Sequence, residues 1–173
     1  SAIAFWWIYD AQFSIISWGL VKMGLIDKYI DFLGDPWNAR LSVIAANIWR
    51  GVPFVAIWLL AGLQTISPSS YEAASLDGAT DWQQFRFVTL PLLTPIIAVV
   101  MTFSVLFTFT DFQLIYVLTR GGPLNATHLM ATLSFQRAIP GGALGEGAAL
   151  ATAMVPFLMA AIPFSYFGLH RRA

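Results

Sequence analysis

Two ionisable side chains lie inside long apolar runs of this sequence and are the first candidates for chemistry. Arg50 interrupts the run 41–63, and Asp111 interrupts the run 87–118. A charged group inside a bilayer is costly, so such residues face a bundle interior or a polar path and often mark a functional site. If the two runs are antiparallel helices, both charges lie about 10 to 13 Å from the same end of the bundle. We therefore expect Arg50 and Asp111 to pair directly or to line a polar path.

Neighbouring side chains could bind a polyhydroxy solute. Asn47 lies one helical turn from Arg50 and shares its face. Phe109 and Gln113 lie two residues to either side of Asp111 and offer a ring for stacking and an amide for hydrogen bonds. Two interpretations of the charged pair stay open, namely an ion pair that holds two helices in register and a lining of the solute path. The aromatic side chains can equally serve packing. The candidate path comprises Asn47, Arg50, Phe109, Asp111 and Gln113, with Phe107, Thr108, Thr110 and Tyr116 as further possibilities.

The sequence offers little for covalent or metal chemistry. It contains no Cys, which excludes disulfides and thiolate metal sites. An intramembrane hydrolase needs a nucleophile and a base within reach of each other. Ser104 lies in an apolar run, but His128 and His170 both flank loops. No Gly-rich phosphate loop with a Lys is present, so ATP hydrolysis is not expected on this chain. We expect no catalytic residue, no metal and no cofactor.

The elements that must position these residues are membrane-spanning helices. Of the 173 residues, 58% are hydrophobic and only 10% are charged, whereas soluble domains carry about 25% charged residues. Crossing a bilayer takes about 20 mostly apolar residues, and the runs at about 41–65, 87–118 and 147–169 are long enough. Buried helices of a soluble protein are the alternative, which three such runs disfavour. We expect an all-α, polytopic transmembrane helix bundle. The zero formal net charge gives no indication of a nucleic-acid partner.

The remaining segments are expected to connect these spans. Residues 1–9 are apolar but too short to cross, and are expected to be the tail of an upstream span, so that the chain is an N-terminally truncated part of a longer protein. Residues 10–40 are predicted to be a solvent-exposed loop with a short amphipathic piece. Gly-Gly-Pro at 121–123 breaks any helix. A helix of about three turns is predicted over 126–139.

Residues 69–87 form one polar, punctuated segment between two apolar runs. Ser69 and Glu72 fit a capping box that would begin a short helix, and Asp77-Gly78 would end it. Thr80 and Gln83 fit a second capping box. The pattern predicts two short helices joined by a tight glycine elbow. Because a simple connection needs far fewer residues, we interpret this segment as a rigid surface on which another protein docks.

The same residues resemble the EAA loop of permease subunits of ABC-type importers. Glu72-Ala73-Ala74, then Gly78 and then Leu90-Pro91 match its pattern, with Val88 where Ile is common. The stretch "DFQLIYVLTRGGPLNAT" at 111–127 and "IWRGVPFVAIWLLAGLQTIS" at 48–67 are similar to the sugar permeases of the maltose and glycerol-phosphate type. The resemblance covers nearly the whole chain from about Asp10 onward.

The resemblance implies a type I importer permease fold in the cytoplasmic membrane, spanning it several times as a single transmembrane domain. In that family the EAA helix is a cytoplasmic coupling helix that seats in an ATPase. The residues that would carry this role here are Glu72, Ala73, Ala74, Leu76, Asp77 and Gly78. Glu72 would then meet a basic group of the ATPase, although it could also complete its own helix cap.

Partners and solute also follow from the resemblance. We expect two separate ATPase subunits, a second permease subunit of the same or another kind, surrounding membrane lipid and an extracytoplasmic solute-binding protein that docks on the outer loops 10–40 and 120–146. The solute would be a sugar or polyol phosphate, and the alternative is an importer for amino acids or polyamines.

Overall fold

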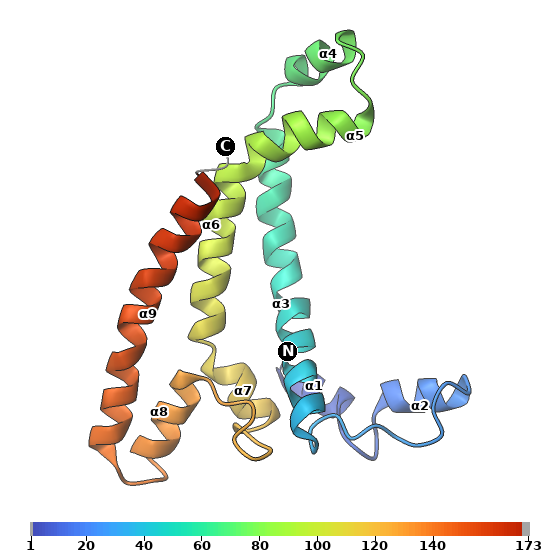
Figure 1. Ribbon diagram of the computed structural model, residues 1–173. Helices are drawn as coiled ribbons and strands as arrows, with labels where there is room; N and C mark the ends of the chain where they lie inside the picture. Colours follow the sequence, from blue (N-terminus) through green and yellow to red (C-terminus); the bar gives the residue numbers. More distant parts are fainter. Residues whose placement is uncertain (1, 171–173) are drawn as a thin grey trace. The chain divides into compact units, whose positions relative to one another are not determined.

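The computed structural model describes residues 2–170, without the side chains of 161, 162 and 164–170. The described chain is helical, with no strand in this range. Its helices are labelled in Figure 1: α1 Ala2–Ile8, α2 Ile15–Lys22, α3 Pro36–Gln64, α4 Pro68–Leu76, α5 Asp81–Gln84, a π-helical turn Phe85–Thr89, α6 Leu90–Phe109, α7 Phe112–Leu118, α8 Met130–Ala138 and α9 Leu144–His170. The chain divides into two compact units.

The first unit comprises residues 1–50 and 107–157. Its core is a small cluster in which α1 packs against α7. Tyr9 packs its ring on Phe32, with 5.4 Å between the ring centroids, and thereby holds the segment before α3. Close approach also joins α8 to α9, where a Cβ added at Gly147 would lie 2.5 Å from the Cβ of Ala138. The buried core residues are Ala2, Tyr9, Ala46, Leu114 and Leu118.

The second unit comprises residues 51–106 and the chain from 158 onward. In it α3 and α6 approach each other closely at Gly62. A Cβ at Gly62 would lie 2.6 Å from Ile96 Cδ1 and 2.8 Å from Leu93 Cδ2. Any larger side chain would therefore separate the two helices at this point.

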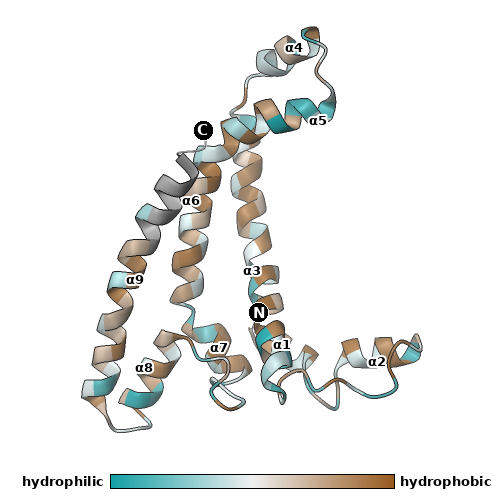
Figure 2. Cartoon of the chain, viewed as in Figure 1, coloured by the Kyte–Doolittle hydropathy of each residue, from teal (hydrophilic) through white to brown (hydrophobic). Residues whose placement is uncertain are grey.

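Two helical stretches among the described residues are long and apolar enough to cross a membrane, namely α3 and the continuous stretch Asp81–Phe109. Only 11% and 17% of their most apolar windows are buried within the chain, whereas a core helix of a soluble protein would be mostly covered. Figure 2 shows apolar residues along the lengths of α3 and α6. The described part of the third predicted span, Leu144–Ala160, is apolar but shorter. These surfaces suit contact with lipid or with partner helices.

The structure corrects the expectation of one continuous helix through 87–118. The helix α6 ends at Phe109, and Asp111 begins a separate helix, α7. The physical reason is that an Asp side chain satisfies the free N–H groups at a helix start, which favours a new helix over continuation. Asp111 Oδ1 accepts a hydrogen bond from Leu114 N at 3.2 Å.

The connections largely follow their sequence signals, with one exception in the segment 10–40. The short helix predicted over 126–139 is α8, and Gly121-Gly122-Pro123 lies in the turn before it. The segment 10–40 contains α2 but is not a simple solvated loop, because several large apolar side chains of this segment are exposed while Ser14 and Ser17 are buried.

Candidate functional site

The α4–α5 hairpin comprises residues 67–89. It begins two residues earlier than the capping pattern predicts. The N-cap is Ser67, whose side chain accepts from the backbone N–H of Ser69 at 3.4 Å, and Pro68 occupies the first turn of α4. The prediction of Ser69 as N-cap is therefore wrong. Proline suits the first helical position because its φ is already helical and its missing N–H would have had no partner there. Glu72 consequently has no capping role.

The elbow of the hairpin lies at Gly78. Its φ is +78°, a conformation that favours glycine, and an added Cβ would meet no atom within 4 Å. Asp77 is the C-cap of α4. After the elbow, Thr80 caps α5, where its backbone N–H donates to Gln83 Oε1 at 2.8 Å. The capping box predicted at Thr80 and Gln83 is thus confirmed.

Two side-chain ties hold the arms of the hairpin together. The hydroxyls of Tyr71 and Thr89 lie 3.0 Å apart, and Thr89 is buried. Gln84 Nε2 donates to Ser75 Oγ at 3.0 Å and to the carbonyl of Ala79 at 3.3 Å. Each tie joins α4 to the helical turns that lead into α6, so that the hairpin is connected to α6 by more than the chain itself.

One side of α4 is left uncovered. Leu76 is 90% exposed, Glu72 and Ala73 are exposed, and Ala74 is half-buried. Glu72 forms no hydrogen bond or ion pair with any residue that the structure describes. On the second arm, the exposed rings of Trp82 and Phe85 stack with centroids 5.6 Å apart. The hairpin therefore offers a free carboxylate, small side chains and apolar side chains on a preformed scaffold.

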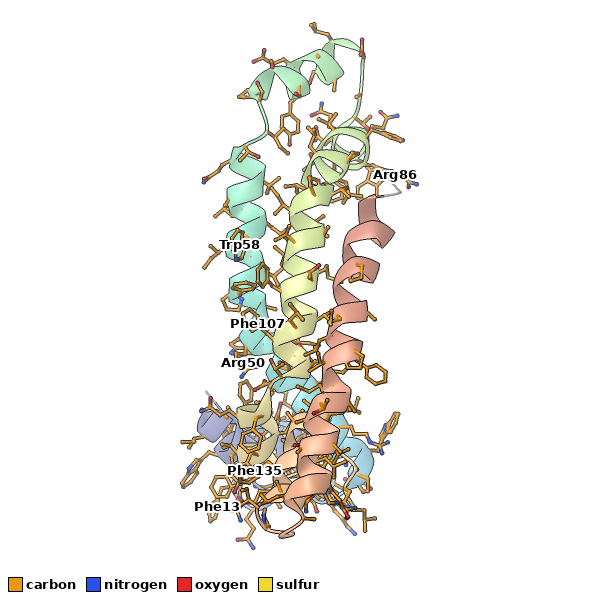
Figure 3. The ribbon with its side chains drawn as sticks, turned by 90° about the vertical axis from the view of Figure 1, so that its left-hand side faces the viewer. Phe13, Arg50, Trp58, Arg86, Phe107 and Phe135 are labelled. Atoms are coloured by element: carbon orange, nitrogen blue, oxygen red, sulfur yellow. The ribbon has the colours of Figure 1, made fainter. Side chains whose placement is uncertain are left out.

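A second feature is the polar cluster of Asn47, Arg50, Thr108 and Asp111 in the first unit. Arg50 Nη2 forms an ion pair with Asp111 Oδ2 and donates to Asn47 Oδ1 at 3.3 Å. Asn47 Nδ2 in turn donates to Thr108 Oγ1 at 3.2 Å. The cluster joins α3, on which Figure 3 labels Arg50, to the break between α6 and α7. Of the two arrangements expected for Arg50 and Asp111, direct pairing is present.

Exposure differs between the two charged partners. The Asp111 side chain is 9% exposed, and both of its oxygens are engaged, one by Arg50 and the other by Leu114 N. The Arg50 side chain is 36% exposed. Because a guanidinium carries five N–H donors, Arg50 retains donors beyond those that it uses in this cluster.

Three other candidate side chains, those of Phe109, Gln113 and Tyr116, do not join this cluster within the described structure. Phe109 and Gln113 are exposed, and neither side chain bonds to the cluster within the described range. Tyr116 stacks on Phe112 at 4.9 Å and packs edge-on against Phe135, the α8 residue labelled in Figure 3, at 5.5 Å. For Tyr116 the packing interpretation therefore holds.

The chain matches a known protein family over nearly its whole length. Residues 2–172 match the family model described as binding-protein-dependent transport system inner membrane component. The chain belongs to this family. The family consists of transport components rather than enzymes, which agrees with the sequence resemblance to importer permeases.

Two individual members of this transport family are similar in sequence to the chain. The chain is 37% identical to the trehalose/maltose transport system permease protein MalF of Thermococcus litoralis, over 74% of this chain and 43% of that protein. It is 35% identical to a probable ABC transporter permease protein of Brucella suis, over 92% of this chain and 55% of that protein. The chain thus spans about half the length of these two curated relatives.

A solved structure supports the fold of this family member. A bacterial ABC transporter involved in the import of the acidic polysaccharide alginate contains a chain with a TM-score of 0.84 and 25% identity, which covers 98% of this chain and 59% of that one. The fold is accordingly the transmembrane helical fold of an importer permease, as the sequence predicts.

Sequence reasoning missed the ties within the hairpin of this transport protein. Tyr71 and Thr89 are 18 residues apart, and no motif marks them. The usable signal was the glycine elbow, since a chain reversal at Gly78 brings residues before and after it together. The helix break at Asp111 did have a local signal, because Asp followed by an apolar run is an N-cap pattern.

Proposed function

We propose that this chain is the membrane-embedded part of a permease subunit of an ATP-driven importer for carbohydrate. The observation that carries the proposal is family membership over residues 2–172 together with the named solutes of relatives, which are trehalose/maltose in one and alginate in another. Sugar, sugar-derivative or polyol solutes present many hydroxyls. Such groups require hydrogen-bonding side chains along the path.

The α4–α5 hairpin is the proposed contact with separate ATPase subunits. Its support is the uncovered side of α4, where Leu76 is 90% exposed and Glu72 has no described partner. An exposed Leu on a preformed helix can fill a pocket, and small Ala side chains allow close approach of a partner. Ala74, Asp77 and Gly78 contribute by shaping the end of this helix. The ties from Tyr71 and Gln84 would transmit movement of the docked hairpin to α6.

The polar cluster has two proposed roles that follow from its exposure. The buried Asp111 carboxylate fixes α3 against the start of α7 through Arg50 and the Leu114 N–H. The half-exposed Arg50, with Asn47 beside it, faces the solute path and donates hydrogen bonds to solute hydroxyls. Phe109 and Gln113 extend the path by ring stacking and amide contacts.

Topology and partners complete the proposal. The chain crosses the cytoplasmic membrane several times, with the α4–α5 hairpin on the cytoplasmic side and residues 120–146 on the outer side. The outer segment receives a solute-binding protein, and a second permease subunit completes the path. The two apolar helical stretches of 29 residues each support the crossings nearest to the hairpin.

ATP-dependent uptake into proteoliposomes tests the proposal. The full-length permease, its partner permease, the ATPase and the binding protein would be reconstituted and offered labelled disaccharide, glycerol phosphate, amino acid and polyamine in separate reactions. Uptake of the disaccharide or of glycerol phosphate alone is expected. Uptake of the amino acid or the polyamine instead would replace the solute class, and uptake without ATP would contradict the importer mechanism.

A further inference from the structure

The short helix α2 is inside out compared with a helix on a water-exposed surface. Its two serines, Ser14 at the N-cap and Ser17 in the first turn, have 0% exposure. The neighbouring apolar side chains are exposed, with Phe13 at 72%, Ile15 at 67% and Trp18 at 53%. On a helix in water the arrangement would be the reverse.

Hydrogen bonds hold the serines inward. Ser14 Oγ accepts from Ser17 N at 3.2 Å, and Ser17 Oγ accepts from Ile30 N at 3.2 Å. The second bond attaches α2 to the segment that continues toward α3. The first bond caps α2 itself, so the orientation of the helix depends on the bond between Ser17 and Ile30.

The exposed side of α2 needs an apolar environment that the described part of the chain does not supply. We call Phe13, Ile15, Ile16, Trp18, Met23 and Leu25 the α2 outer face. Membrane-spanning helices also expose apolar residues, but α2 has only eight residues and cannot cross a bilayer, which takes about 20. Several large exposed apolar side chains on and beside one short helix indicate contact with a partner protein or with a membrane.

Charge and orientation favour the membrane. The Lys22 ammonium lies 4.7 Å from the centre of the Trp18 ring, and neither Lys22 nor Lys28 forms an ion pair among the described residues. A Trp and a Lys at one level are typical of the membrane–water interface. Figure 1 shows α2 running crosswise to α3, whose first part belongs to the same unit. A helix crosswise to a spanning helix lies along the bilayer surface.

Most of the nearby carboxylates have local backbone partners. Asp10 accepts from the backbone N–H groups of Gln12 and Phe13, Asp31 from Gly34 N, and Asp35 from Trp37 N and Asn38 N. Three of the four acidic side chains in this segment thus serve as local turn and cap acceptors, whereas the ammonium groups of Lys22 and Lys28 have no ion-pair partner among the described residues.

We propose that α2 is an interfacial anchor that lies at the boundary between headgroups and acyl chains, with the α2 outer face among the acyl chains. Lys22 and Lys28 reach the phosphates of phospholipid headgroups. The anchor fixes the segment before α3 at the membrane surface. This role depends on neither the solute class nor ATP coupling.

Fluorescence quenching at single cysteines tests the anchor. These 173 residues contain no Cys, so one label site can be introduced into the full-length permease complex in phospholipid nanodiscs, with any cysteines elsewhere replaced by serine. The sites are I15C and M23C on the α2 outer face and D27C as the matched control in the same segment. The quenchers are a nitroxide attached to a lipid acyl chain and aqueous iodide.

Labels at 15 and 23 are expected to lose most of their fluorescence to the lipid nitroxide and little to iodide, whereas the label at 27 is expected to show the opposite. Iodide quenching at all three sites would overturn the proposal, because the outer face would then be in water. Protection from both quenchers would also overturn it, and if that protection required the solute-binding protein, the occupant would be that protein.

Discussion

The two oxygens of the Asp111 carboxylate have different partners, Arg50 on α3 and the backbone N–H of Leu114 on α7. One side chain therefore starts a helix and at the same time joins that helix to another. This explains why a charged residue is present in an otherwise apolar run.

Replacing Asp111 separates its two roles. Asp111→Asn keeps an oxygen for the Leu114 N–H but loses the charge that pairs with Arg50, whereas Asp111→Ala loses both. A cap contributes about 1 kcal/mol, and a hydrogen bond to a charged group about 1.5 to 3 kcal/mol. The melting temperature of the purified complex is expected to decrease in the order wild type, Asn, Ala. Equal melting temperatures for the two variants would show that the cap contributes nothing.

Leu76 is the most exposed large apolar side chain of the hairpin, so a partner would bury the largest fraction of it. Leu76→Ala is expected to leave the melting temperature of the permease unchanged and to weaken ATPase binding by about tenfold, the equivalent of ~1.4 kcal/mol lost from an interface contact. Leu124→Ala is the matched control, since Leu124 is 89% exposed but lies in the turn before α8. Co-purification and titration of the ATPase measure both. An equal effect of the two substitutions would argue against docking at α4.

Substitution of Gly78 tests whether ATPase docking needs the backbone conformation of the elbow. Gly78→Ala places a side chain at φ +78° and is expected to cost about 1 kcal/mol through backbone strain alone, because no atom lies within 4 Å of the added Cβ. Gly24→Ala creates the same strain at φ +72° in another loop, again in open space. Similar losses of thermal stability are expected, with reduced ATPase co-purification only for Gly78→Ala. Reduced co-purification for both would mean that general destabilisation is the cause.

Substitutions at the hydroxyl pair of Tyr71 and Thr89 test whether movement of the hairpin is transmitted to α6, separately from ATPase docking. Tyr71→Phe removes the bond between the two hydroxyls, with a net worth of about 1 kcal/mol. Thr89→Val removes this bond and also the longer bond from Thr89 Oγ1 to the Gln84 carbonyl at 3.5 Å. ATPase binding is expected to persist, while the solute-dependent increase in ATP hydrolysis decreases several-fold. The double variant should resemble Thr89→Val, because that substitution already removes the interaction that Tyr71→Phe removes. Thr94→Val is the control, since it removes a bond within α6 only. If Thr94→Val gave the same decrease, the pair of Tyr71 and Thr89 would have no specific role in transmission.

His128 gives the stability of the segment 120–146 a pH dependence. Burial lowers the pKa of its imidazole, and Nε2 is buried without a hydrogen-bond partner in the described structure. The unfolded chain therefore binds a proton at higher pH than the folded one. The His128 contribution to stability is complete above about pH 6.5 and decreases as the pH falls from there toward the folded pKa. His128→Asn should reduce the decrease in melting temperature between pH 7.5 and 5.5. An unchanged decrease would assign the pH dependence to other groups.

The sequence was sufficient for elements whose signals are local. Gly78, the Thr80–Gln83 capping box and the Gly121-Gly122-Pro123 turn each act through a few neighbouring residues, and each lies where the pattern predicts. The start of α4 was misplaced by two residues because two serines compete as caps, and the choice depends on how Pro68 fits the first turn.

Contacts between elements could not be predicted in the same way. That Arg50 and Asp111 lie at similar depth and could pair followed from the sequence, but lining of a polar path was the open alternative. That Asn47 would bond Thr108, or that Ser14 and Ser17 would be buried while Phe13 and Trp18 stay exposed, depends on how helices pack. Composition does not determine that packing, because any side of a largely apolar helix can be the buried one.

The π-helical turn Phe85–Thr89 contains one residue more than an α-helical turn would, with Leu90 N bonded to the carbonyl of Phe85. Since each residue of an α-helix rotates the chain by about 100°, this insertion fixes the rotational phase of α5 relative to α6. Deleting one residue here would swing Trp82 and the rest of the hairpin around the helix axis by roughly that angle. The number of residues in this turn therefore sets the direction in which the hairpin faces. Substitutions on the hairpin surface would not change that direction.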